Sequence, residues 1–320
     1  MIFPFSIIII IIAFLGTGLP VLCYRVKLLY QFPYPFQQFE NIAVHPRGGL
    51  ILTTWGDGSI YTLDPHAKDT TPQLLVKVPG IDSLTGITET TRGVYAIAGG
   101  LRSSQDYQFF HGSAMIMTLN LNTGLITGMA ALPSHPHYVF MAEPLDDCLR
   151  IIDLMTGAYQ VAHRLREFGV DRPRPPGSIP FGVNGLKIRN DTLYFTNSGQ
   201  LTLGRMKLGE WGTQVGKIRI LTTLRDKPLQ MPNDFALSRN GKTAYIATHP
   251  NTIVRFARHK KWNDVVETSY FEGNSTVPIN SPTAAALSNN EKVLYVTTRG
   301  THETGGQILE IRLEKGDRGA

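Results

Sequence analysis

The chain has 320 residues, 31 glycines, 20 prolines and a net charge of +6 at neutral pH. Its basic residues are spread along the sequence. We interpret the tightest group, Arg255, Arg258, Lys260 and Lys261, as a charged strand edge that blocks pairing with other chains. A nucleic-acid-binding protein concentrates its positive charge on one surface, so we expect no nucleic-acid partner.

The first 23 residues differ from the rest of the chain. They contain a run of six isoleucines and no charged side chain, and they end with Gly16, Gly18, Pro20 and Cys23. This pattern predicts a secretory signal peptide over 1–23, cleaved after Gly18 or Cys23, and hence a secreted protein. The alternative is an uncleaved membrane anchor, because the segment is near the length of a membrane span.

The remaining sequence shows no sustained helical periodicity, and six similar segments follow one another. They are ENIAVHPRGGLILTTW from Glu40, TGITETTRGVYAIAGG from Thr85, TGMAALPSHPHYVFMAEP from Thr127, NGLKIRNDTLYFTNSG from Asn184, NDFALSRNGKTAYIATHP from Asn233, and TAAALSNNEKVLYVTTRG from Thr283. The starts are 45, 42, 57, 49 and 50 residues apart. Such a period, with several short strands per copy, is typical of a β-propeller. We predict an all-β fold, a single-domain six-bladed β-propeller over 24–320.

Alignment of the copies gives two rings of residues. The first ring opens each copy and should face a central channel: Glu40, Thr85, Thr127, Asn184, Asn233 and Thr283. The second ring closes the second strand of each copy: Thr54/Trp55, Ala98/Gly99, Ala142/Glu143, Asn197/Ser198, Thr248/His249 and Thr298/Arg299. The sequence leaves open which mouth of the channel the second ring borders.

Other motifs are weaker. Two sequons, at Asn190 and Asn274, fall in predicted turns and could carry glycans on the secretory route. His135-Pro136-His137 has the residue types of a metal pair, but we interpret it as a solvated turn between strands. A disulfide between Cys23 and Cys148, the two cysteines of the chain, requires that signal cleavage leave Cys23 in place.

The copy starts resemble those of the gluconolactonase and regucalcin-like propellers, over residues 35–313. That family holds one divalent cation between a Glu, an Asn and an Asp from three blades, and the resemblance places Glu40 and Asn184 in the first two positions. At the third position the family has the sequence Pro-Asp-Gly, whereas this chain has Pro232-Asn233-Asp234. One carboxylate is a poor donor set for a hard cation, so we expect no required metal and no cofactor. If a metal binds, its ligands are Glu40, Asn184 and either Asn233 or Asp234.

A narrower resemblance is carried by the phrases LTGITE, GVNGLKIRNDTLYFTNSG and PTAAALSNNEKVLYVTTRG. They are similar to a branch of secreted fungal propellers that includes hetero-Diels–Alderases of tropolone- and phenol-sesquiterpenoid biosynthesis. The resemblance implies loss of water from a hydroxymethyl aromatic or tropolone precursor, followed by addition of the quinone methide to a humulene-type alkene. The partners would be two apolar small molecules, one polyketide-derived and one sesquiterpene.

The predicted site suits a mostly apolar ligand with one polar end. Aromatic side chains of nearby loops surround it: Phe36, Tyr107, Phe109, Phe110 and Tyr138. Glu40 and His249 are the titratable pair that could move protons. The expected substrate-binding residues are Trp55, Asn184, Asn233, Asp234, Thr283 and Arg299.

Three functions remain open at the level of sequence. The first is a pericyclase, because a cycloaddition needs orientation of its partners rather than a nucleophile. The second is a metal-dependent lactonase or related hydrolase. The third is a propeller that binds a small molecule without catalysis. The oligomeric state stays open.

Overall fold

The computed structural model describes residues 25–102, 109–110, 113–116, 119–120, 125–170, 181–224, 231–259, 265–272 and 277–313. The predicted signal peptide or anchor, Tyr107 and Asn274 therefore lie outside the described residues. Within the described ranges, no helix has the length and apolar character needed to cross a membrane.

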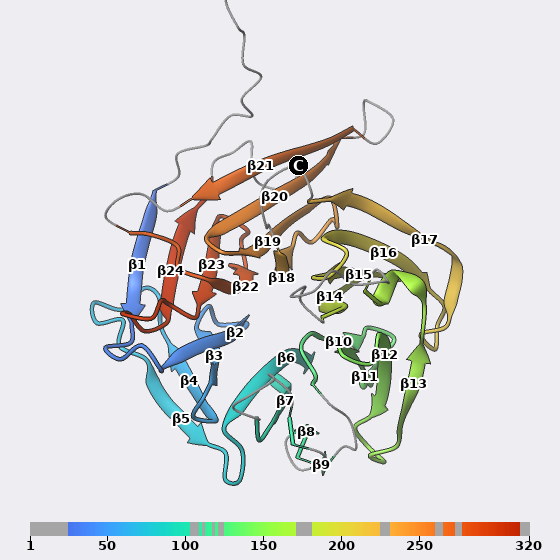
Figure 1. Cartoon of the computed structure of the whole chain (residues 1–320), viewed down its shortest axis with the longest axis horizontal. Helices are drawn as coiled ribbons and strands as arrows, with labels where there is room; N and C mark the ends of the chain where they lie inside the picture. Colours follow the sequence, from blue (N-terminus) through green and yellow to red (C-terminus); the bar gives the residue numbers. More distant parts are fainter. Residues whose placement is uncertain are drawn as a thin grey trace, which may run out of the picture.

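The described strands form six four-stranded antiparallel sheets around a common centre (Figure 1). Blade one contains β2 (Gln38–Val44), β3 (Leu50–Trp55), β4 (Ser59–Leu63) and β5 (Gln73–Lys77). Blade two contains β6 (Ser83–Thr91), β7 (Val94–Gly100), β8 (Met115–Ile116) and β9 (Leu119–Asn120). Blade three contains β10 (Met129–Leu132), β11 (His135–Glu143), β12 (Cys148–Asp153) and β13 (Tyr159–His163).

The second half of the ring repeats this order. Blade four contains β14 (Val183–Arg189), β15 (Thr192–Asn197), β16 (Thr202–Leu208) and β17 (Gln214–Thr223). Blade five contains β18 (Met231–Leu237), β19 (Thr243–His249), β20 (Thr252–His259) and β21 (Val265–Glu272). Blade six contains β22 (Pro282–Leu287), β23 (Val293–Thr298), β24 (Gln307–Arg312) and β1 (Val26–Gln31). The predicted six-bladed fold is confirmed.

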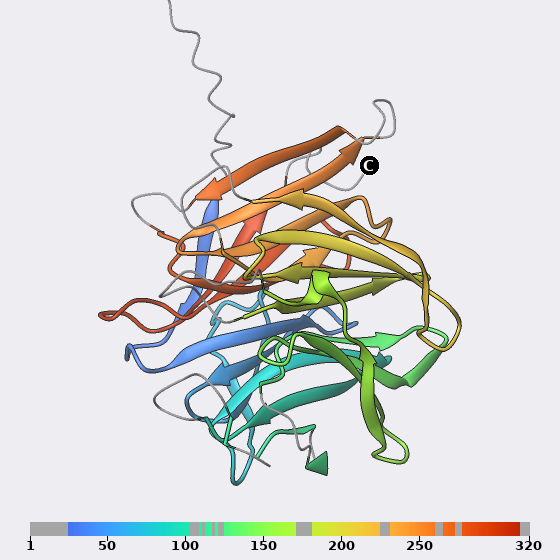
Figure 2. The ribbon, with the colours of Figure 1, turned by 45° about the vertical axis from the view of Figure 1, so that its right-hand side comes forward.

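Two local features complete the ring. The 3-10 helix η1 (Arg166–Phe168) follows blade three and buries Phe168 against Phe195 of blade four. A single residue pair, Trp55 with Ser83, joins the sheets of blades one and two. The N-terminal strand β1 pairs with the last strand β24, so the two ends of the fold meet in blade six (Figures 1 and 2).

The core lies between the blades. Second strands such as β19 are buried along nearly their whole length, whereas the outer strand β5 is exposed at every position. Leu50 and Leu52 of β3 have no exposed surface and pack with β22 and β24 residues of blade six. Burying one such side chain stabilises the fold by about 1.5–3 kcal/mol. The short strands therefore owe their stability to contacts between neighbouring sheets.

Polar side chains of the first predicted ring link one blade to the next. The hydroxyl of Thr127 donates to the backbone oxygen of Asn184 at 3.1 Å, and that of Thr283 donates to Phe39 at 3.2 Å. Thr85 donates in the same way to Ile126. Asn41, one residue after Glu40, donates to the backbone oxygen of Thr85 at 3.0 Å. These bonds hold the inner strands at a constant separation around the channel.

Three interpretations of the sequence are corrected by the fold. His135 begins strand β11 rather than lying in a turn, and its ring stacks on Trp211 at 3.9 Å. Tyr138 of the same strand lines a different, outer cavity, away from the channel. Arg255 is only 4% exposed and is part of the inside of blade five rather than of a charged edge.

The basic residues are also less dispersed than the sequence indicates. A hollow on the consecutive strands β16 and β17 is lined by four cations, Arg205, Lys207, Lys217 and Arg219, with Asp191 beside them. Arg205 and Arg219 are direct partners across the two strands. The expectation that nucleic acid is not a partner stays a prediction.

Candidate functional site

Antiparallel pairing explains where the second predicted ring lies. The end of each second strand faces the start of its inner strand, as in the pairs Gln38 with Trp55 and Met231 with His249. Residues from both rings therefore meet at one mouth of the channel. We call this mouth the front site. It is lined by Glu40, Trp55, Thr85, Leu125, Thr127, Phe181, Asn184, Met231, Asn233, His249 and Arg299.

A buried ion pair lies at the front site. The carboxylate of Glu40 is 8% exposed and accepts from Arg299 Nη2 at 3.1 Å and from Nε at 3.3 Å, both at Oε2. Burial raises the pKa of the Glu40 carboxyl, although the neighbouring Arg299 acts in the opposite direction. Glu40 thus has the environment of a carboxyl group that can hold a proton above its ordinary pH range.

Trp55 forms the apolar wall of the front site. It is 5% exposed, and Phe109 stacks beside it with ring centroids 6.5 Å apart. The guanidinium carbon of Arg299 lies 5.5 Å from the Trp55 centroid, and that of Arg102 lies 5.7 Å away. These contacts are cation–π interactions, which favour a positive charge beside an indole ring.

Two amides complete the polar side of the front site. Asn184 Nδ2 donates to Ser198 Oγ at 3.0 Å, and Asn233 Nδ2 lies 3.4 Å from His249 Nε2. The amide oxygens of both residues are then available to a ligand as acceptors. Burial and the charge of Arg299 lower the pKa of His249 to about 3, so this ring is neutral at pH 7.

The low pKa of His249 changes its predicted role. A general base works best when its pKa is near the working pH. At about 3, His249 is a weak proton acceptor and suits hydrogen bonding to a ligand better. Glu40 is therefore the better-placed proton carrier of the pair.

The front-site donor set does not fit a calcium-type cation. Glu40 is the one carboxylate at the three family positions, and Arg299 occupies its Oε2. A guanidinium at this distance also repels a divalent cation. Asp234 does not supply the missing charge, because both of its oxygens bind Lys187 Nζ, at 2.7 and 2.8 Å.

Two predicted binding residues lie elsewhere. Asp234 is 4% exposed and its Lys187 partner belongs to the other end of the channel, so it is not part of the front-site lining. Thr283 is 1% exposed, and its hydroxyl bonds to Phe39 of blade one and to Thr297 of its own blade. Of the predicted loop aromatics, Phe109 contacts Trp55, whereas Phe36 and Phe110 are 86% and 58% exposed. The sequon residue Asn190 lies in the exposed turn after β14, as expected.

Arg102, Leu125, Phe181 and Met231 were missed by the sequence analysis. Leu125, Phe181 and Met231 precede an inner strand or begin it, and Arg102 follows β7. A search of the residues just before each first-ring position would have found Met231, two positions before Asn233. Arg102 gives no comparable signal, because it reaches Trp55 from the neighbouring blade.

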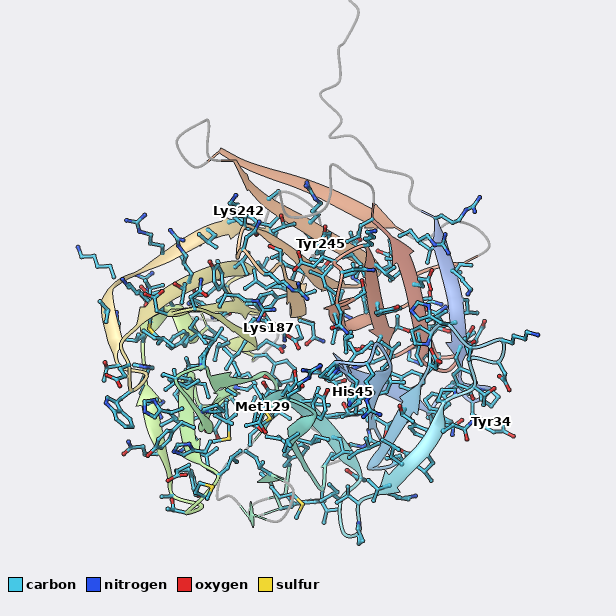
Figure 3. All side chains as sticks on the ribbon, turned by 180° about the vertical axis from the view of Figure 1, so that it is seen from behind. Tyr34, His45, Met129, Lys187, Lys242 and Tyr245 are labelled. Atoms are coloured by element: carbon cyan, nitrogen blue, oxygen red, sulfur yellow. The ribbon has the colours of Figure 1, made fainter. Side chains whose placement is uncertain are left out.

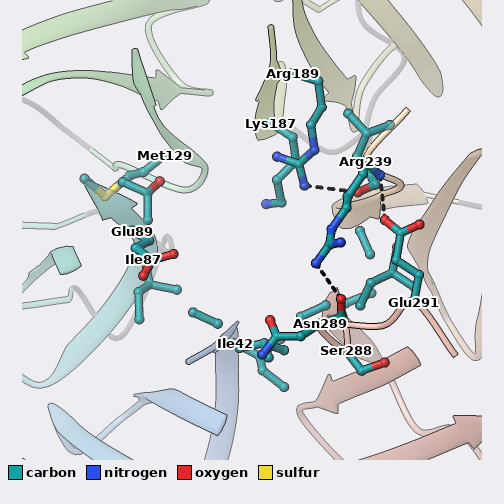
Figure 4. A pocket seen from close by; sticks show the side chains of 18 of the residues that line it. Ile42, Ile87, Glu89, Met129, Lys187, Arg189, Arg239, Ser288, Asn289 and Glu291 are labelled. Atoms are coloured by element: carbon teal, nitrogen blue, oxygen red, sulfur yellow. Dashed lines mark hydrogen bonds between the residues drawn. The ribbon is translucent and has the colours of Figure 1, made fainter. Parts of the chain in front are cut away.

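The opposite mouth of the channel has different chemistry. Its cavity, of about 250 Å³, is lined by the later residues of the inner strands and by the turns after them. Figure 3 shows Met129 and Lys187 near the centre of this face. In Figure 4, Lys187 and Arg189 lie across the cavity from Glu89, and Arg239 lies beside Glu291. Positive and negative groups are thus mixed here, and Tyr95 is the aromatic residue of the lining.

Comparison with known proteins agrees with this architecture. No protein-family model matches the chain. A Phoma sp. protein named "Putative hetero-Diels-Alderase" is 27% identical over 317 residues, an alignment that covers 85% of this chain and 86% of that protein. Regucalcin from Agrobacterium tumefaciens has a TM-score of 0.56 at 14% identity, with 92% of this chain and 97% of that chain covered.

Gluconolactonase from Xanthomonas campestris has a TM-score of 0.56 at 12% identity, over 91% of this chain and 90% of that chain. This chain has the fold of the regucalcin and gluconolactonase propellers. A luciferin-regenerating enzyme shares the propeller too, with a TM-score of 0.61 at 12% identity over 93% of this chain and 97% of that one. The resemblance stated from the sequence is thus confirmed as a likeness of fold.

Proposed function

We propose that the protein is a hetero-Diels–Alderase acting on a hydroxymethyl aromatic or tropolone precursor and a humulene-type sesquiterpene. The Phoma sp. relative supports this proposal by its name and by an alignment over most of both chains. The observation that carries it is the front site, where the buried acid Glu40, the guanidinium of Arg299 and the indole ring of Trp55 meet.

The front site suits both steps of such a reaction. Loss of the hydroxymethyl oxygen as water needs a proton on that oxygen and removes the proton of the ring hydroxyl. Burial raises the pKa of Glu40, so its carboxyl can give the first proton and its carboxylate can then take the second. The quinone-methide oxygen that forms can accept from Arg299, whose charge stabilises negative charge there. The addition then forms one C–O and one C–C bond, for which face-to-face orientation against Trp55 supplies the rate and the facial preference.

The size of the front site limits how the substrates lie. The enclosed cavity is about 40 Å³, whereas sites for drug-sized ligands span about 300–1,000 Å³. We infer that the polar end of the precursor enters the cavity and that the sesquiterpene lies outward, beyond Trp55.

The direct test follows product rate and stereoisomer ratio with and without protein, using a hydroxymethyl tropolone precursor and humulene. The proposal expects faster formation and one enriched stereoisomer. The uncatalysed product ratio in the presence of folded protein would contradict it, and would favour a non-catalytic binding propeller.

Two variants separate the roles of site residues. Trp55→Ala should erode stereoselectivity as well as rate, because it removes apolar surface worth about 2–4 kcal/mol in positioning. Glu40→Gln should slow quinone-methide formation and leave selectivity largely intact. Thermal melts check folding, and Trp55→Phe is the matched control for lost packing. Full selectivity in Trp55→Ala with scrambled selectivity in Glu40→Gln would reverse the assignment.

The alternative is a metal-dependent lactonase of the gluconolactonase type, which the shared fold favours, although Arg299 pairs with the carboxylate of Glu40. Treatment with EDTA distinguishes the two. We expect the cycloaddition to survive EDTA. Lactone hydrolysis that EDTA abolishes and calcium or zinc restores would establish the alternative.

A further inference from the structure

Two guanidinium groups flank Trp55, and they belong to different blades. Arg299 follows β23, and Arg102 follows β7. The backbone N–H of Arg102 donates to Asp82 Oδ1 at 3.0 Å. Arg102 also forms an isolated antiparallel β-bridge with Phe109, whose ring stacks beside Trp55. The backbone of Arg102 is therefore held against the front site.

The two guanidinium groups beside Trp55 differ in their ion pairing. Arg299 is paired with Glu40, whereas Arg102 has no carboxylate within 4.0 Å among the described residues. The carboxylates of the adjoining loops accept from neutral donors: Asp57 accepts from Ser59 Oγ at 3.0 Å, and Asp82 accepts from the Arg102 backbone N–H at 3.0 Å. His249 is neutral at pH 7. Among the residues that the structure describes, Arg102 is thus the guanidinium beside Trp55 that no carboxylate pairs.

Space is left beside that charge. Gly56 has a φ of +108°, and a Cβ atom added there would lie 3.8 Å from Arg102 Nη2. The same Cβ would lie 3.4 Å from the backbone oxygen of Phe36, so a glycine at this position satisfies an unusual backbone conformation and keeps a side chain away from the Arg102 guanidinium. A planar anion could approach Arg102 and Arg299 together, since each guanidinium offers several donors in one plane.

We propose that the front site selects a conjugated anion and binds its charged oxygen between Arg102 and Arg299, with the ring beside Trp55. This inference rests on the proposed function for its role in catalysis. In that reaction, the precursor would bind with its ring oxygen ionised. Carboxylate, phenolate and enolate oxygens share this chemistry. Arg102 is then a specificity-determining residue.

Isothermal titration with 2-naphthoate and 2-naphthamide tests the charge preference, because the two probes have the same ring and nearly the same shape. We expect the wild-type protein to bind 2-naphthoate at least about tenfold more tightly, since charge-assisted hydrogen bonds are the stronger class. The preference should weaken with added salt because ions screen it. Equal affinity for both probes, or binding of neither, would overturn the proposal. A matched pair of phenol and anisole compounds then distinguishes a phenolate from a carboxylate ligand.

Three variants locate the preference. Arg102→Met should reduce 2-naphthoate affinity about tenfold and leave 2-naphthamide unchanged. Arg102→Lys should retain part of the preference, because it keeps the charge and loses the planar fork. Arg92→Met, in an exposed turn, is the control and should match the wild type. An unaltered preference in a folded Arg102→Met protein would refute the role of Arg102.

These titrations are independent of turnover. If the protein prefers the anion but does not catalyse the cycloaddition, the inference about Arg102 is supported and the proposed function is contradicted. Cycloaddition with equal affinity for both probes would do the reverse.

Discussion

Burial acts in opposite directions on the two titratable residues of the front site. It raises the pKa of Glu40 and lowers the pKa of His249 to about 3, because in each case it disfavours the charged form. Glu40 remains capable of carrying a proton, whereas His249 stays neutral. Two side chains that look like an acid–base pair in the sequence thus have different chemistry in the folded protein.

His249 should make the protein less stable in acid. Its unfolded form binds a proton below about pH 6.5, and the folded form does so only near pH 3. The contribution of neutral His249 to the free energy of unfolding is therefore fully present above pH 6.5 and is lost as the pH falls toward 3. Urea unfolding at pH 7.5 and 4.5 should show a smaller acid loss for His249→Gln than for the wild type. His66→Gln, at an exposed position, is the control and should behave as the wild type. An equal acid loss in His249→Gln would contradict the assignment.

Lys187 and Asp234 illustrate a buried pair whose halves depend on each other. The Asp234 side chain is 6% exposed, and Lys187 is its cation at 2.7 Å. Lys187→Met should lower the free energy of unfolding by about 3 kcal/mol, because it leaves a buried carboxylate unpaired. Lys187→Met combined with Asp234→Asn should recover most of this loss in urea denaturation. Because the pair is not part of the front-site lining, 2-naphthoate affinity should stay unchanged in the double variant. A large loss of affinity would show that Asp234 contributes to ligand binding at the front site.

At the scale of the elements, the inner strands of neighbouring blades approach so closely that side-chain size is restricted. A Cβ atom at Gly128, just before β10, would lie 2.2 Å from the backbone oxygen of Asn184 and 2.7 Å from the backbone nitrogen of Leu186. Backbone atoms cannot move aside as a flexible side chain can. The glycine therefore sets the spacing between blades three and four.

Gly128→Ala should destabilise the protein by about 1–3 kcal/mol, the usual cost of overpacking, and should displace Asn184. The measurement is urea unfolding together with 2-naphthoate titration, and we expect both to weaken. Gly49→Ala is the matched control, since its nearest neighbour would lie 3.7 Å away. A Gly128→Ala protein with wild-type stability would show that the inner strands separate freely.

For the whole molecule, ring closure depends on a strand from the far end of the chain. Strand β1 pairs with β24 from Val26 with Ile311 to Gln31 with Gln307. It also places Val26 and Leu29 in the core clusters of blade six. Blades one and six also meet where β2 contacts β22, and Leu29 of β1 packs with Leu50 and Leu52 of blade one.

Deletion of residues 1–31 should therefore prevent stable folding or strongly lower the melting temperature, because it exposes the edge of β24 and removes buried apolar surface. A chain that begins at Tyr24 keeps β1 and is the control. Circular dichroism and thermal melts compare the two. A cooperative, wild-type melt of the shorter chain would show that blade six is complete without β1.

The repeat in the sequence determined the number of blades and the positions of Glu40, Asn184 and Asn233, because each copy repeats the same order of a polar first residue, an apolar strand, a turn and a second strand. It also brought Trp55, His249 and Arg299 into one ring. The mouth they share was decided by antiparallel pairing, which puts the end of each second strand beside the start of its inner strand.

Only the tertiary structure decided the partners of these residues. Asp234 and Thr283 have the spacing of site residues, yet one binds Lys187 and the other joins two blades. Arg102 reaches Trp55 from a neighbouring blade, a contact that no repeat within one blade encodes. A repeat specifies what each blade has in common, whereas the charge balance of the channel depends on which blades become neighbours when the ring closes.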